Sequence, residues 1–222
     1  MEQHSQSVKL MGNNFVITVV TENEAQAKIQ IAFAIEEIQR IERLLTTYKS
    51  DSQTNLINEN AGIRPVKVDV EVIDLIERSI AISHITQGAF DITYGSIDKT
   101  LWNFDKTMTQ LPDAVTAKKM VHLINYENII LDKSNHTVFL KEKGMRIGFG
   151  GIGKGYAAEM AKNVLLKNNV QSGIINASGD LTAWGNQANG KAWTIGVANP
   201  DTPTAAFSYL EISNMAVATS GN

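Results

Sequence analysis

Cysteine is absent from the 222-residue sequence. Without cysteine the chain can form no disulfide bond, no thiolate metal site and no cysteine nucleophile. The chain contains four histidines: His4, His84, His122 and His136. They are expected in helices, a tail or a loop, away from the motifs described below. A Ser-His-Asp catalytic triad is therefore unsupported.

Long apolar runs are missing as well. No stretch of 18 apolar residues occurs, so the sequence predicts no membrane-spanning helix. The first residues, MEQHSQSVKLMG, lack the apolar core of a signal peptide. If the native protein is exported, its targeting segment lies outside this sequence.

Charge of one sign is not concentrated anywhere along the chain. The formal net charge is −3, which argues against a protein that grips a nucleic-acid backbone, because that task needs a basic face. With 43% hydrophobic and 19% charged residues, the composition is that of an ordinary globular protein. The length suits one large domain or two small ones.

The sequence does contain both helical and strand patterns. Apolar residues at helical spacing predict helices over about 24–45, 69–85 and 154–168, with another opening near Pro112. Runs rich in β-branched and aromatic residues predict strands near 14–20, 128–132, 137–142, 145–149, 173–177, 193–199, 207–212 and 215–220. The polar residues 46–62 predict an irregular loop. Because strict βαβ alternation is absent, the pattern favours an α+β fold.

A glycine-rich segment, MRIGFGGIGKGYAAEM (145–160), matches two nucleotide-binding patterns, each with a defect. The kinase-type loop needs a Ser or Thr after the lysine to hold Mg²⁺, but Gly155 follows Lys154. The dinucleotide loop needs a βαβαβ unit and an acid about 20 residues further on, and Asp180 lies beyond that spacing. Either way, the glycines, the following helix and the lysine favour an anion. A tight turn with a solvated lysine is the alternative.

Two further stretches place acids beside glycines. TQGAFDITYGSI (86–97) sets an aromatic and an acid between two glycines, which suits stacking and hydrogen bonding to a heteroaromatic ring. NASGDLTAWG (176–185) sets an acid at a strand end, where it could bind a metal or a ribose. For each stretch taken alone, an ordinary turn with a capping acid is the simpler interpretation.

The order of these motifs resembles the FAD:protein FMN transferase family, also called the ApbE family. The resemblance runs from Met11 to Asn222 and rests on MGNNF, ERLLTTYKSDSQTNLINENAG, QGAFDITYGSI, LWNF, LPDA, GFGGIGKGYAAEMA, IINASGDLTAWG, GKAWTIGVANP and AVATSGN. It implies a protein that binds FAD and Mg²⁺, cleaves the pyrophosphate and transfers FMN to a Thr or Ser hydroxyl of an acceptor flavoprotein, releasing AMP. It implies antiparallel sheets backed by helices, with a cofactor cleft between them.

The resemblance also implies site residues. The motif positions expected to bind the cofactor are Met11, Tyr48, Ala89, Phe90, Asp91, Gly148, Lys154, Asp180, Thr219 and Ser220. Met11 and Tyr48 would pack near the flavin or adenine. The backbone carbonyl of Gly151 would be one Mg²⁺ ligand. The attacking hydroxyl comes from the partner, so the chain needs no nucleophile of its own, and catalytic residues are expected beyond residue 222.

This sequence departs from the family pattern in places. Many members carry Asp where this chain has Gly148, and its loss removes an acceptor for the cofactor. Members also continue past the final Ser-Gly with a His-x-x-Asp-Pro-like motif and an Asp–Thr pair that ligates Mg²⁺. Residues 1–222 are therefore expected to form a single catalytic domain without its C-terminal segment. Because Mg²⁺ wants several oxygen ligands, this chain is expected to bind it weakly and to transfer FMN slowly or not at all.

Other functions stay open at this point. The chain could hold FAD without catalysis, or it could hydrolyse FAD to FMN and AMP; a dinucleotide-dependent oxidoreductase is a more distant alternative. The expected partner is an acceptor flavoprotein and not a nucleic acid. The resemblance favours a periplasmic or lipid-anchored location at the inner membrane for the native protein, with the cytoplasm as the alternative.

Overall fold

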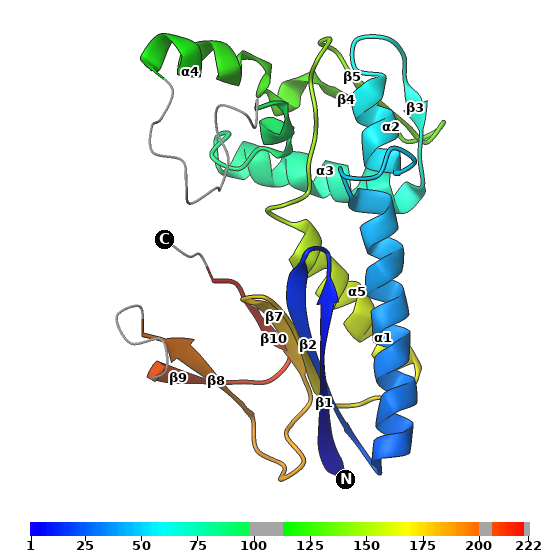
Figure 1. Ribbon diagram of the computed structural model, residues 1–222, viewed down its shortest axis with the longest axis vertical. Coiled ribbons are helices and arrows are strands. Elements are labelled where there is room, and N and C mark those ends of the chain that lie inside the picture. The colour runs from blue at the N-terminus through cyan, green and yellow to red at the C-terminus, as the bar shows by residue number, and fades with distance from the viewer. Residues whose placement is uncertain (98–112, 200–205, 220–222) are drawn as a thin grey trace. The chain divides into compact units, whose positions relative to one another are not determined.

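A computed structural model describes residues 1–97, 113–199 and 206–219 (Figure 1). Helices and antiparallel sheets make up the described residues, which confirms the predicted α+β class. The chain divides into two compact units, Met1–Glu42 with Gly153–Asn222, and Arg43–Ile152. No helix within the described ranges is long and apolar enough to cross a membrane.

The first unit contains a five-stranded sheet in the order β1-β2-β6-β7-β10, with every pairing antiparallel. Its strands are β1 (Glu2–Leu10), β2 (Asn13–Thr21), β6 (Gly173–Ala177), β7 (Asp180–Trp184) and β10 (Met215–Val217). Helix α5 (Gly153–Lys167) packs against β6 and β7. Helix α1 (Glu24–Leu45) begins in this unit and ends in the other.

Strand β1 was not predicted, because its sequence, EQHSQSVKL, is polar and lacks a strand-like apolar face. It forms because a two-residue turn folds it back onto β2, whose apolar residues Phe15, Ile17 and Val19 are fully buried. The turn residues, Met11 and Gly12, both have positive φ, at 50° and 74°. That pair of angles matches the twist of two adjacent strands and sets their register.

The predicted apolar stripe of α1 is confirmed. Ala27, Ile31, Ile38 and Ile41 are all buried, at the helical spacing that the sequence shows. Each of the three isoleucines contributes about 1.5–3 kcal/mol when fully buried. The stripe therefore fixes which face of α1 turns inward.

A two-stranded sheet of β8 (Trp193–Ala198) and β9 (Ala206–Ile212) completes the first unit. Trp193 and Ile212, which pair across the two strands, are buried in a cluster with Leu181 and Ala183 of β7. This cluster ties the small sheet to the large one.

The second unit combines short helices with a three-stranded sheet in the order β3-β5-β4. Its strands are β3 (Val66–Lys67), β4 (Ile129–Asp132) and β5 (Thr137–Leu140). Its helices are α2 (Gln53–Glu59), α3 (Val70–Ile85) and α4 (Ala114–Met120), and its 3-10 turns are η1 (Ile92–Ser96), η2 (Val121–Leu123) and η3 (Tyr126–Asn128). The predictions for α3, β4 and β5 are confirmed, and Pro112, predicted to open α4, lies outside the described residues.

Two predictions for this unit were wrong. The segment 46–62 is not irregular throughout, because α2 occupies residues 53–59. Residues 145–149, predicted as a strand, pair with no strand among the described residues.

Candidate functional site

The glycine-rich segment crosses the boundary between the units, with Ile152 ending one and Gly153 beginning the other. Residues 145–149 are irregular, residues 150–152 form a turn, and α5 starts at Gly153. The predicted site residues therefore fall into two groups, one within each unit. The second unit contains Tyr48, Ala89, Phe90, Asp91, Gly148 and Gly151, and the first contains Met11, Lys154, Asp180 and Thr219.

Side chains hold the start of the segment in place of a neighbouring strand. Asn58 of α2 is buried and bonds both polar backbone atoms of Ile147: its Nδ2 donates to the carbonyl at 3.1 Å, and its Oδ1 accepts from the amide at 2.7 Å. Ser96 likewise donates to the Arg146 carbonyl at 3.1 Å and accepts from its amide at 2.9 Å. These side chains satisfy the backbone of Arg146 and Ile147 as a neighbouring strand would, so the segment needs no place in a sheet.

Two aromatic side chains approach the glycines of the same segment. The amide of Gly150 donates to the hydroxyl of Tyr94 at 3.1 Å. A Cβ atom on Gly150 would collide with that hydroxyl, and one on Gly151 would lie 3.3 Å from Cε2 of Phe90. A side chain at either position would therefore have to displace an aromatic ring that lies against the backbone.

The backbone amides of the segment are only partly available to a ligand. Gly148 donates to the Ile92 carbonyl at 2.9 Å, Gly150 donates to Tyr94, and Ile152 donates to the Phe149 carbonyl at 3.1 Å. The amides for which no acceptor occurs among the described residues are those of Gly151, Gly153, Lys154 and Gly155. The predicted anion-binding capacity thus belongs to the second half of the segment and to the first turn of α5.

The phenol of Tyr94 has its pKa raised above the ordinary tyrosine value, chiefly because the ring is partly buried. The hydrogen bond from Gly150 acts in the opposite direction, and the neighbouring Tyr48 phenol raises the pKa further. Tyr48 itself is 90% exposed. The structure therefore places Tyr48, Phe90 and Tyr94 in the same unit as residues 145–152 of the glycine-rich segment.

Asp91, predicted to line the cofactor, uses both carboxylate oxygens within the protein. Oδ1 accepts from the amide and the hydroxyl of Thr93, at 2.8 and 2.7 Å, and Oδ2 accepts from the Tyr126 amide at 2.9 Å. The carboxylate thus caps η1 and anchors the start of η3. Its neighbour Ala89 is exposed. Cofactor contact by either residue stays a prediction.

The second group lies at one end of the five-stranded sheet. The turn Met11–Gly12 joins β1 to β2, and the turn Ser178–Gly179 joins β6 to β7. Because Phe15 pairs with Ala177, the two turns lie at the same end of the sheet. Met11 and Asp180 therefore lie at the same end of the sheet, where these strands begin or end.

Thr219, two residues after the end of β10, lies at this same end of the sheet. Its hydroxyl donates to the Gly179 carbonyl at 3.1 Å, and the Gly179 amide in turn donates to Oδ1 of Asn176 at 3.0 Å. Ser220 lies outside the described residues.

Lys154 also lies near this end. Five residues connect Lys167, the last of α5, to Gly173, the first of β6, and the two elements pack together, so α5 runs antiparallel to β6. The first turn of α5 is then at the Ala177 end of β6. That turn contains no acidic residue of its own.

A bound Mg²⁺ does not fit the described residues by themselves. Among them, no group of three or more His, Asp or Glu side chains could hold a metal ion. The predicted ligand, the Gly151 carbonyl, is a single oxygen, whereas Mg²⁺ demands near-octahedral oxygen coordination. The described residues alone therefore do not complete a Mg²⁺ site.

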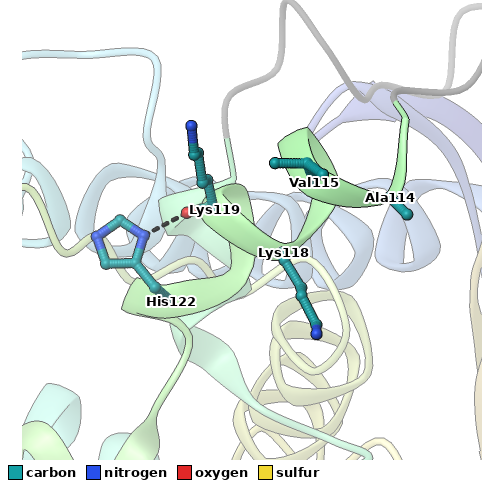
Figure 2. A pocket seen from close by; sticks show the side chains of 5 residues that line it. All are labelled: Ala114, Val115, Lys118, Lys119 and His122. Atoms are coloured by element: carbon teal, nitrogen blue, oxygen red, sulfur yellow. Dashed lines mark hydrogen bonds between the residues drawn. The ribbon is translucent and has the colours of Figure 1, made fainter.

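The pocket shown in Figure 2 is separate from both groups. It is lined by Ala114, Val115, Lys118, Lys119 and His122, and the His122 ring bonds the Lys119 carbonyl through Nδ1. None of the predicted site residues lines this pocket. Its walls come from one short helix and the turn that follows it, so we assign it no function.

Known proteins decide the family. The sequence model of the ApbE family matches residues 11–222. The chain belongs to the ApbE family. It is 32% identical over 219 residues to a FAD:protein FMN transferase of Klebsiella pneumoniae (strain 342), covering 98% of this chain and 66% of that protein. A second FAD:protein FMN transferase, from Salmonella typhimurium, is 26% identical and is covered over 62% of its length.

Solved structures of ApbE proteins share the fold. The ApbE protein of Thermotoga maritima matches with a TM-score of 0.88 and 28% identity, covering 99% of this chain and 71% of that one. The flavin transferase ApbE of Vibrio cholerae matches with a TM-score of 0.87 at 20% identity. The match covers all of this chain and 72% of the Vibrio cholerae chain. The present chain spans less than two thirds of the length of the two curated ApbE relatives above.

The sequence did not predict the residues that hold the glycine-rich segment, namely Asn58, Tyr94 and Ser96. One signal was present for Asn58: Thr54, Asn55 and Asn58 recur at helical spacing, and all three are buried. A polar stripe of this kind marks a helix that hydrogen-bonds to loops on its inner face. No comparable pattern marked Tyr94 or Ser96.

Proposed function

We propose that this chain provides the FAD-binding part of an FAD:protein FMN transferase, which moves FMN from FAD to a Thr or Ser hydroxyl of an acceptor flavoprotein and releases AMP. The observation that carries the proposal is the match of the ApbE family to residues 11–222. The amides of Gly151, Gly153, Lys154 and Gly155, which have no acceptor among the described residues, support the proposal physically. Helix N-termini and unpaired amides favour phosphate.

The reaction needs no nucleophile from this chain. The acceptor hydroxyl oxygen attacks the phosphorus on the FMN side of the pyrophosphate, and a new phosphoester bond forms. The bond from that phosphorus to the bridging oxygen breaks, AMP leaves with the bridging oxygen, and the hydroxyl proton passes to solvent. Charge grows on the phosphate oxygens as the bond breaks, so amides and an ammonium group that are already in place lower the barrier.

In the proposal, Lys154 and the amides beside it in the first turn of α5 bind phosphate. Within the second unit, Phe90 and Tyr48 are aromatic side chains of a kind that can stack on a flavin or adenine ring. Mg²⁺ dependence is also part of the proposal, through the resemblance to the family, with the Gly151 carbonyl as the only ligand assigned to this chain. When bound, the metal would supply positive charge to the phosphates.

The test is an assay with FAD, Mg²⁺ and a Thr-containing acceptor flavoprotein, in which released AMP and acceptor-bound FMN are both quantified. Equal amounts of the two products support transfer. Lys154→Ala should weaken FAD binding about tenfold, because a charge-assisted contact to phosphate is lost. Lys167→Ala is the matched control, since Lys167 is exposed in the last turn of the same helix. Equal losses in both variants would argue against a phosphate site at Lys154.

A second candidate is a protein that holds FAD without transferring FMN. It is favoured by the lack of a metal-binding side-chain group among the described residues. FAD binding without any AMP release would support it, whereas AMP release without acceptor would indicate FAD hydrolysis.

For the native protein we propose a periplasmic or inner-membrane-anchored location, with the cytoplasm as the alternative. Cell fractionation of the native host separates these locations.

A further inference from the structure

Tyr94 has no role in the function proposed above, yet it lies directly on the glycine-rich segment. Its hydroxyl accepts the Gly150 amide at 3.1 Å, and a Cβ on Gly148 would lie 3.3 Å from the same oxygen. The ring is carried by η1, whose first residue, Ile92, accepts the Gly148 amide through its carbonyl. The phenol is therefore fixed to the segment by two independent attachments.

The proton of this hydroxyl is available for a further hydrogen bond. A phenol can accept and donate at the same time, and the Gly150 amide uses only its acceptor side. No acceptor for the Tyr94 proton occurs in the part of the chain that the structure describes, and the side chain is 38% exposed. Because burial raises the pKa of Tyr94, the proton stays on the oxygen at neutral pH.

We infer that Tyr94 positions the pyrophosphate of FAD by donating its hydroxyl proton to a non-bridging phosphate oxygen, while the Gly150 amide holds the hydroxyl in place. This inference rests on the proposed function, because it names a further residue of the same site. The neighbouring amide of Gly151 has no acceptor among the described residues, so a phosphate oxygen at Tyr94 has a second donor one residue further on. A chain of amide, hydroxyl and phosphate is also cooperative, since each hydrogen bond polarises the next.

An alternative role for Tyr94, in which its hydroxyl blocks the Gly150 amide, predicts the opposite change in FAD affinity. If the phenol only occupied an amide that the phosphate needs, its removal would free the Gly150 amide and strengthen FAD binding. The sign of the change in affinity therefore separates a donor from a blocking group.

The experiment measures FAD affinity by flavin fluorescence in the presence of Mg²⁺, for the unmodified chain, for Tyr94→Phe and for Tyr209→Phe. Tyr94→Phe keeps the ring and removes only the hydroxyl, so binding should weaken about tenfold or more, the usual effect of losing a hydrogen bond to a charged group. Tyr209 lies on β9 and is 68% exposed, outside both groups of predicted site residues, so its variant should bind FAD as the unmodified chain does.

A second measurement separates contact with phosphate from a purely structural role. At saturating FAD, the ³¹P resonances of the bound pyrophosphate should shift in Tyr94→Phe and stay unchanged in Tyr209→Phe, while the melting temperatures without ligand stay close to that of the unmodified chain. Unchanged or tighter binding in Tyr94→Phe would overturn the inference, as would weaker binding with unchanged ³¹P resonances. If the unmodified chain itself binds no FAD, the proposed function fails, and this inference fails with it.

Discussion

At the scale of single residues, the contact between Tyr94 and Gly150 explains why the segment needs its glycines. The phenol oxygen occupies the space that a side chain at position 150 would fill. The glycine-rich pattern thus reflects packing within the protein as well as the approach of a ligand. From the sequence, these glycines predicted either an anion site or a tight turn. The aromatic partner was not predicted, because it lies more than fifty positions earlier in the chain.

The collision at Gly150 predicts a coupling between two substitutions. Gly150→Ala should destabilise the chain only when the Tyr94 hydroxyl is present, because the ring carbon that bears the hydroxyl is 3.6 Å from the added Cβ, an ordinary contact. Overpacking typically costs about 1–3 kcal/mol, so we expect a coupling free energy of about 1 kcal/mol between Gly150→Ala and Tyr94→Phe. Urea unfolding of both single variants and the double variant measures it. Gly150→Ala with the same effect in both backgrounds would contradict the proposed contact.

The raised pKa of Tyr94 predicts a loss of stability in alkali. In the unfolded chain this phenol ionises near its ordinary pKa of about 10, whereas in the folded chain it ionises at higher pH. Between the two values the unfolded state binds fewer protons, so the free energy of unfolding falls as pH rises. Unfolding measured at about pH 9 and about pH 11 should show a smaller decrease in Tyr94→Phe than in the unmodified chain. Equal decreases would show that Tyr94 ionises normally.

At the scale of secondary-structure elements, the sequence predicted what a repeating apolar pattern can encode. The stripe of α1 and the strands β4, β5 and β6 were predicted within a few residues of their observed bounds. Helix α2 was missed because its buried face contains Thr54, Asn55 and Asn58, which do not register as apolar. Residues 145–149 have strand-like composition, but long-range hydrogen bonds decide whether a strand forms, and here side chains supply them.

The two hydrogen bonds between the Asn58 side chain of α2 and the backbone of Ile147 are here called the Asn58 clamp. The clamp predicts a large loss of stability when the Asn58 carboxamide is removed. Asn58→Ala leaves a buried backbone amide and carbonyl without partners, so we expect a loss of about 2–4 kcal/mol in the free energy of unfolding. Asn60→Ala is the control, because its side chain is half-buried and, among the described residues, bonds only the Leu56 carbonyl within its own turn. That variant should stay within about 0.5 kcal/mol of the unmodified chain. Similar losses in the two variants would rule out a special role for the clamp.

The candidate site was predicted in outline from the order of the motifs, and its contacts were not. Motif order identified Phe90 and the glycine-rich segment, which the structure shows in contact, and it identified Asp180 and Thr219, which lie at one end of one sheet. It gave no information on which amides of the segment are already bonded. That information depends on Ile92 and Tyr94, whose positions follow from the tertiary fold.

At the scale of the whole molecule, each of the two compact units contains part of the predicted site, and the chain spans less than two thirds of the length of its curated relatives. The described residues contain no group of three or more acidic or imidazole side chains able to hold a metal. Oxygen ligands must come from several groups for Mg²⁺ to bind tightly.

We therefore expect weak Mg²⁺ binding by this chain, with a dissociation constant in the millimolar range when measured by isothermal titration calorimetry. A family member with the full length of the curated relatives, measured under the same conditions, should bind Mg²⁺ more tightly. Comparable affinities for the two proteins would show that residues 1–222 already contain a complete metal site.

The Asn58 clamp also bears on how this region can change over evolutionary time. Both of its bonds end on main-chain atoms of Ile147, so they do not depend on which side chain that residue bears. Position 147 can therefore drift among apolar residues of similar size while the carboxamide opposite it cannot. Substitutions that vary this buried segment are therefore best begun at position 147, with position 58 left as it is.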